Sequence, residues 1–117
     1  MAMGYRDRNR RVAQIKRDLY SESVKCYFCN ATREIIYMDT VHLIRRSHAK
    51  GLIDCKENIV LGCRDCHDIF DNKFSKWEKL NQGNLITALL RIKGMDELYF
   101  NRLIIKANEA GWTGLTV

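Results

Sequence analysis

Two short cysteine pairs place the strongest constraint on how this 117-residue chain can fold. The first pair is Cys26-Tyr-Phe-Cys29 and the second is Cys63-Arg-Asp-Cys66, with residues 30–62 between them. A two-residue gap lets both thiolates of a pair reach one ion, and two such pairs supply the four tetrahedral ligands that Zn²⁺ prefers. The sequence therefore predicts a structural zinc site that clamps both ends of the segment between the pairs.

The expected compartment favours this interpretation of the cysteines. Residues 1–20 are rich in arginine and lack the apolar stretch of a secretory signal, and no apolar run approaches the roughly 20 residues of a membrane span. We therefore expect a cytoplasmic protein that makes no membrane contact and has reduced thiols. Two alternatives stay open: four unligated buried cysteines, or a redox-active pair. Cys55 is predicted to be a partly buried, small apolar residue outside the site.

The charge of the chain favours a polyanionic partner. The formal net charge is +6, from 20 basic and 14 acidic residues. Residues 6–20 carry six of the basic side chains, and Val12, Ile15 and Leu19 fall at helical spacing. We predict a basic amphipathic helix there, which either caps the domain with a solvated face or contacts phosphates directly.

The order of the predicted elements is typical of an α+β protein. Residues 34–44 are rich in β-formers and predict a strand that ends near His42, and residues 48–57 are predicted to form a loop. A short second strand at residues 58–61 precedes a helix from Arg64 to about Phe74. Apolar stripes then predict helices at residues 74–80 and 85–92, the latter ended by Gly94, and at 98–107, with Asp96 as N-cap and Gly111 as stop. The stripe residues, Leu90 and Leu98 among them, are predicted to lie in the core.

We expect one domain over residues 1–117. It would comprise a basic N-terminal helix in residues 1–24, a zinc-stapled core in residues 25–74, and a helical C-terminal extension in residues 75–117. The sequence does not indicate what the extension does.

A second set of residues lies within and just after the clamp. His42 is followed by Arg46-Ser47, and Asn58 opens an aliphatic run into the second cysteine pair, which His67 directly follows. This arrangement resembles the zinc-bearing HNH endonucleases over about residues 26–72. The resemblance implies a small ββα-metal core, in agreement with the strand, loop, strand and helix order.

The resemblance also implies roles for individual side chains. His42 would be the general base that activates water, and a neutral imidazole suits that task. His67 would bind a catalytic divalent ion, Mg²⁺, Mn²⁺ or another, together with Asp71 four residues later on the same helix face. Asn58 would brace the loop that carries the base, or touch the metal. Cleavage would leave 5′-phosphate and 3′-hydroxyl ends.

One position departs from the family pattern. The residue before the general base is often a metal ligand, but here it is Val41. The ion would then depend on His67 and Asp71, with Asp39 or His48 as further candidates. Nearby cations are expected either to bind phosphates or to be solvated loop residues: Arg45, Arg46 and Lys50.

The sequence thus predicts an HNH-type endonuclease that hydrolyses DNA, with a role in phage or mobile-element DNA processing implied by the resemblance alone. One alternative is a non-catalytic, zinc-stapled DNA-binding module in which Val41 marks a decayed active site. Another is a zinc-stapled adaptor that binds proteins through its C-terminal helices.

Overall fold

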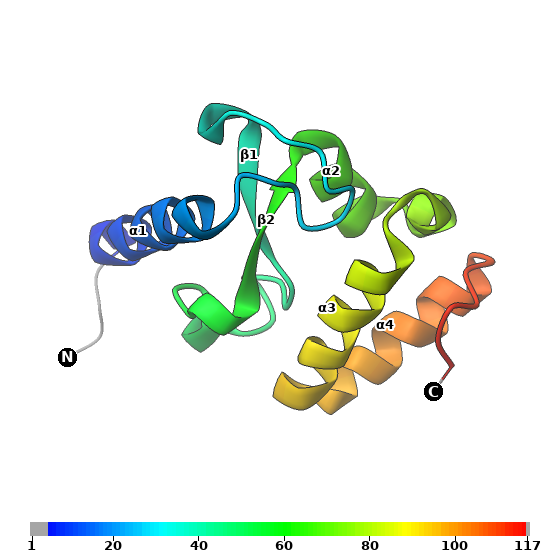
Figure 1. Ribbon diagram of the computed structural model, residues 1–117. Coiled ribbons are helices and arrows are strands. Elements are labelled where there is room, and N and C mark those ends of the chain that lie inside the picture. The colour runs from blue at the N-terminus through cyan, green and yellow to red at the C-terminus, as the bar shows by residue number, and fades with distance from the viewer. Residues whose placement is uncertain (1–4, 117) are drawn as a thin grey trace.

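The computed structural model describes residues 5–116 and has an α+β fold, as predicted. Two strands and the helix that follows them form the centre, and the remaining helices surround it (Figure 1). The elements are α1 (Tyr5–Glu22), β1 (Met38–His42), β2 (Ile59–Cys63), α2 (Arg64–Asn72), α3 (Gln82–Met95) and α4 (Glu97–Glu109). Short 3-10 turns, η1 to η4, occupy Ile35–Tyr37, Lys50–Leu52, Lys56–Asn58 and Phe74–Lys79.

The two strands pair in an antiparallel sheet that fixes the ends of the predicted clamp. Met38 at the start of β1 lies opposite Cys63 at the end of β2, and His42 lies opposite Ile59. Every residue of β2 is buried. Because α2 begins at Arg64, directly after β2, the second cysteine pair spans the junction between strand and helix. The predicted strand, loop, strand and helix order is therefore confirmed.

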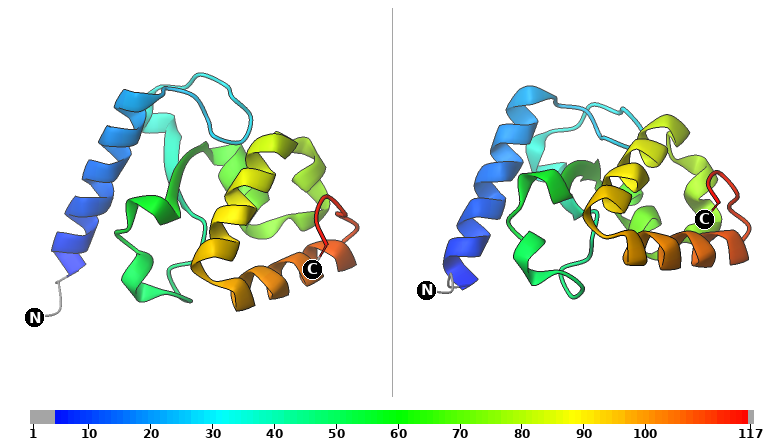
Figure 2. Two further views of the ribbon diagram at one scale, coloured as in Figure 1. Left: turned by 60° about the horizontal axis from the view of Figure 1, so that its bottom comes forward. Right: turned by 90° about the horizontal axis from the view of Figure 1, so that it is seen from below.

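Helix α1 lies along one side of the sheet, and the α3–α4 pair lies on the other side, in all the ribbon views (Figures 1 and 2). The predicted basic helix is therefore present, and it packs against both strands. Its apolar residues Val12, Ile15 and Leu19 are only partly buried. Within residues 5–116, none of the helices combines the length and the apolar composition that a bilayer crossing requires.

A row of aromatic rings joins the core to the C-terminal extension. Phe28 stacks on Phe70 at 5.2 Å between ring centroids, Phe70 on Trp77 at 5.9 Å, and Trp77 meets Trp112 edge-on at 5.3 Å. Large aromatic side chains contribute much of the apolar area that stabilises a small core. One buried cluster therefore extends from the first cysteine pair to the C-terminal segment.

Hydrogen bonds attach the start of α3 to the first cysteine pair. The Asn81 side chain caps α3 by accepting from the Asn84 backbone N–H, and the Asn81 N–H donates to the Phe28 carbonyl oxygen at 2.6 Å. The Asn84 amide donates in turn to the Tyr27 carbonyl oxygen. The extension is thus hydrogen-bonded to the turn that carries Cys26 and Cys29.

The first strand is shorter than predicted. Residues 35–37 form the turn η1, closed by a hydrogen bond from the Tyr37 N–H to the Glu34 carbonyl oxygen, and Ile36 is 60% exposed. The reason is the register: Met38 already pairs with the last residue of β2, so the residues before it have no partner strand. Residues 74–79 likewise form a 3-10 turn rather than an α-helix.

Asp96 and Gly111 bound the last helical segment as predicted, but α3 does not end at Gly94, and the buried faces of both helices are narrower than predicted. Asp96 caps α4 by accepting from the Tyr99 N–H at 3.0 Å, and Gly111, with φ of 100°, ends the segment in a conformation that favours glycine. Helix α3 continues through Gly94 to Met95. Leu90 and Leu98, predicted to be core residues, are 50% and 73% exposed, because each helix buries only the face toward its neighbours.

Adjacent leucines on α3 give a direct test of this packing. Leu89 is fully buried and Leu90 is half exposed, so both alanine variants change helix propensity equally but only one opens a cavity. We expect Leu89→Ala to lower the free energy of unfolding by about 2–5 kcal/mol. Leu90→Ala should change it by about 0.5 kcal/mol or less. Urea denaturation of freshly purified, reduced protein measures both, and equal losses would contradict the packing.

Candidate functional site

The four predicted clamp cysteines meet at one point. The sulfur atoms of Cys26, Cys29, Cys63 and Cys66 all lie within 4.8 Å of one another. Three of these residues are buried, and Cys29 is exposed. Within residues 5–116, no other set of three or more His, Cys, Asp or Glu side chains is gathered in this way. The group could therefore hold a metal ion such as zinc, in agreement with the spacing of the pairs.

Local backbone geometry brings the two pairs together. The first pair lies in a tight turn in which the Asn30 N–H donates to the Cys26 carbonyl oxygen at 2.9 Å. Asn30 has a φ of 62°, a conformation that asparagine tolerates better than most residues. The Cys63 N–H donates to the Cys26 sulfur at 3.3 Å, which links the turn to the end of β2. Such N–H to sulfur contacts favour a thiolate.

The electrostatics of the cluster also fit a cation. The hydrogen bond from the Cys66 thiol lowers the pKa of Cys26 to about 4, and the same contact, together with burial, raises the pKa of Cys66. Without a cation, sulfur atoms this close share protons, because a thiol donates to a neighbouring thiolate. With a bound cation, its positive charge would allow all four cysteines to be thiolates. Cys55 lies outside the cluster, half-buried as predicted, and its thiol donates to the Glu57 carboxylate at 3.0 Å.

His42 and His67, the two histidines that carry the HNH resemblance, lie together in a cavity distinct from the cysteine cluster. A cavity of about 680 Å³ opens between α1, β1 and α2, and both His42 and His67 line it. The predicted residues Asp71, Arg45 and Arg46 line it as well, whereas Lys50 does not. Four more residues complete the wall: Lys16, Asp39, Thr40 and Ser47.

His42 is held in one orientation by a backbone carbonyl. Its Nε2 lies 2.8 Å from the Ile53 carbonyl oxygen, and because that oxygen only accepts, Nε2 carries the proton in the neutral ring. The other nitrogen, Nδ1, is then left with a lone pair. Burial lowers the pKa of His42 below 6.5, and the nearby Arg46 lowers it further, against the opposing effect of the Ile53 carbonyl. His42 is thus neutral at physiological pH.

Asn58 fixes the loop that contains Ile53, whose carbonyl oxygen is the hydrogen-bond partner of His42. Its side chain is fully buried, and its oxygen accepts from the Ile44 N–H at 2.7 Å. Its amide nitrogen donates to the Ile44 and Leu52 carbonyl oxygens at 3.0 and 3.2 Å. Asn58 therefore joins the chain after β1 to the segment just before Ile53. Of the two roles considered for it, these contacts fit the bracing of the loop.

His67 lies between two carboxylates. Its Nε2 is 2.9 Å from Asp71 Oδ2, and its Nδ1 is 3.1 Å from Asp39 Oδ2. Asp71, followed by Asp39, raises the pKa of His67 to about 9, although burial acts in the opposite direction. The spacing of four residues on α2 therefore places His67 and Asp71 in contact, as the helix period requires.

The structure gives a physical account of Val41. This side chain is fully buried, and a Cβ added to Gly62 would lie 2.9 Å from its Cγ2. The Val41 side chain therefore packs in the core and does not line the cavity. Asp39, two residues earlier on β1, lies beside His67, where it also approaches the guanidinium of Arg64 at 3.7 Å.

Some residues of the cavity carried only a weak signal in the sequence. Lys16 was one of many cations in a basic helix, and Thr40 had no distinguishing feature beyond its place two residues before His42. Asp39 was only one of several possible ligands. His48, another of these, is exposed and packs against the Tyr99 ring at 4.9 Å between centroids, so it does not line this cavity.

Comparison of the chain with models of protein families, with curated proteins and with solved structures finds no match. The assignment of this site therefore depends on its residues and their geometry.

The metal content of cysteine variants tests the cluster. We expect about one Zn²⁺ per chain in freshly purified, reduced protein, because four sulfur ligands complete one tetrahedral shell. Cys63→Ser should lose the ion, since a hydroxyl is a poor ligand for zinc. Cys55→Ser makes the same chemical change outside the cluster and should retain it. Elemental analysis measures both, and loss of the ion from Cys55→Ser alone would contradict the assignment.

Proposed function

We propose that this protein is an HNH-type endonuclease that hydrolyses DNA phosphodiester bonds. The observation that carries the proposal is the shared cavity, in which a neutral His42 with an unprotonated Nδ1 lies with the contacting pair of His67 and Asp71. Phosphodiester hydrolysis requires a base that activates water and a cation that stabilises negative charge. His42 would be the base, and His67 and Asp71 in the same cavity would bind the cation. The net charge of the chain, +6, favours a polyanionic substrate.

The donor atoms of the site suit a divalent ion of the magnesium type. His67 Nε2 and Asp71 Oδ2 are 2.9 Å apart, and neighbouring ligands of an octahedral ion with bonds of about 2.1 Å are separated by about 3 Å. Such ions are bound through few protein ligands, with water and phosphate oxygens completing the shell. When bound, the ion would stabilise negative charge on the phosphate and the leaving 3′-oxygen.

The side chains of the cavity would divide the remaining work. His42 would accept a proton from the attacking water at Nδ1, while its Nε2–H stays on the Ile53 carbonyl oxygen. Asn58 would keep that carbonyl in place through its bonds to the flanking loop. Arg45 and Arg46 would attract and hold the phosphate backbone, in a manner largely independent of base sequence.

The buried position of Val41 weakens the main argument for a decayed site. A valine there packs the sheet, and Asp39 supplies a carboxylate beside His67 from the same strand. A non-catalytic DNA-binding module remains the alternative outcome of the tests below.

Removal of the proposed base should abolish most cleavage. We expect His42→Ala to nick supercoiled plasmid about 10²–10⁴-fold more slowly than the wild type, with Mg²⁺ or Mn²⁺ present, because no other group takes the proton. Added imidazole should restore part of the rate, since it can enter the space left by the ring. Zinc content and thermal stability serve as controls for folding. DNA binding without metal-dependent nicking by the wild type would support the non-catalytic module instead.

The pH dependence of nicking should report on the same histidine. Because burial lowers the pKa of His42 below its ordinary value, the ring stays mostly neutral down to a more acidic pH than a free imidazole does, and a bound divalent cation would lower the pKa further. We expect the rate, measured at a divalent-ion concentration that saturates the site at each pH, to decline with a midpoint on the acidic side of 6.5, the ordinary pKa of histidine. The residual activity of His42→Ala should lack this decline. A loss of wild-type activity centred above pH 6.5 would argue against His42 as the base.

A further inference from the structure

We infer that helix α4 provides a second phosphate-binding surface, which extends the cavity of His42 and His67 along the DNA backbone. This inference rests on the proposed function for the identity of the polyanion as DNA. It assigns a task to the C-terminal extension, which lies outside the residues of the HNH resemblance.

A second cavity carries the inference. It has a volume of about 360 Å³ and lies between the loop after β1, the end of α2 and helix α4. Arg102 and Lys106 of α4 line it, and so do Asn72 and Phe74 near the end of α2. Arg102 and Lys106 are four residues apart, so the helix presents both cations on one face.

The two cavities share a wall. Arg45 and Asp71 line both of them, and the guanidinium of Arg45 donates to the Asp71 carbonyl oxygen. Arg45 is therefore held at the boundary, where it can face a phosphate in either cavity. A phosphate backbone bound beside His42 would therefore meet Arg45 at the boundary and then the cations of α4.

The balance of charge along this path is positive. The cations of the two cavities are Lys16, Arg45, Arg46, Arg102 and Lys106, and the carboxylates are Asp39 and Asp71. Five positive and two negative charges leave +3, before any charge on His67 is counted. Both carboxylates contact His67, and Glu109, the acidic residue of α4 nearest in sequence to these cations, lines neither cavity.

The cations of α4 are placed by a rigid element rather than by a mobile loop. Leu103 is nearly buried and Ala107 fully buried between them and the core, whereas Arg102 and Lys106 are exposed. Neither makes an ion pair with another side chain in the described part of the chain. Fixed, unpaired cations at helical spacing beside a reactive site are suited to binding successive phosphates of one backbone.

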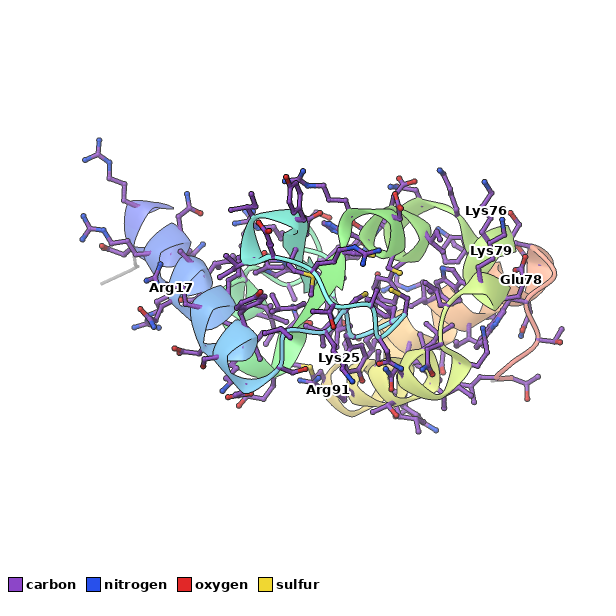
Figure 3. All side chains as sticks on the ribbon, turned by 45° about the horizontal axis from the view of Figure 1, so that its top comes forward. Arg17, Lys25, Lys76, Glu78, Lys79 and Arg91 are labelled. Atoms are coloured by element: carbon purple, nitrogen blue, oxygen red, sulfur yellow. The ribbon has the colours of Figure 1, made fainter. Side chains whose placement is uncertain are left out.

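Two lysines elsewhere provide a matched control. Lys76 and Lys79 are exposed on η4, line neither cavity, and lie at the end of the molecule away from Arg17 of α1 (Figure 3). The double variant Lys76→Ala/Lys79→Ala removes two positive charges, as many as Arg102→Ala/Lys106→Ala removes. A difference between these variants therefore reports the position of the charges and not their number.

The experiment measures binding to a duplex without added divalent cation, as a function of salt, together with nicking in its presence. We expect Arg102→Ala/Lys106→Ala to reduce the slope of log affinity against log salt by about 2, which corresponds to about tenfold less loss of affinity between 50 and 200 mM salt. The control variant should keep the wild-type slope. Thermal unfolding and zinc content verify that both variants are folded.

The two readouts separate this inference from the proposed function. Equal slopes for the α4 variant and the wild type would overturn the inference, even if nicking proves to depend on His42. Equal reductions in both double variants would also overturn it, because the effect would then be one of net charge. A reduced slope in the α4 variant alone supports the phosphate surface, even if the wild type does not nick DNA and the proposed function fails.

Discussion

The convergence of four cysteine sulfurs is the contact on which the rest of the structure depends. It joins a turn near residue 26 to the junction of β2 and α2, although 33 residues separate the two pairs. Closing a loop of this length opposes chain entropy, and a metal ion bound by four thiolates would offset that term. Because β2 and α2 are continuous at Cys63, the same closure sets the direction in which α2 leaves the sheet, and so the position of His67.

The candidate active site is built around this closure by hydrogen bonds rather than by apolar packing. Asn58 is the only buried polar residue in the described chain, and its side chain connects the chain after β1 to the loop that holds His42. A buried amide that meets three backbone groups fixes a loop more specifically than apolar contacts do, because each unmade bond is costly. The two histidines thus depend on different supports: His42 on a braced loop, and His67 on the helix that follows the cysteines.

The C-terminal extension belongs to the same architecture. Its aromatic residues continue the row of rings that starts at Phe28, and its first helix is hydrogen-bonded to the turn of the first cysteine pair. This attachment gives α4 a fixed relation to the cavity of His42. The extension, predicted from sequence only as helices of unassigned role within the one domain, therefore brings Arg102 and Lys106 to a cavity that adjoins the site.

The sequence by itself determined the clamp, the order of the elements and the spacing of the histidine site. Those features depend on local rules: the two-residue gap between metal ligands, the period of a helix, and the capping preferences of Asp96 and Gly111. It did not determine where β1 begins, because the start depends on the length of its partner strand. It did not place Asp39 beside His67, or bury Val41, since burial along β1 departs from the strict alternation that strand periodicity predicts. Only the tertiary structure decided which of the many cations share a cavity with His42, because residues distant in sequence come together through packing that no local pattern records.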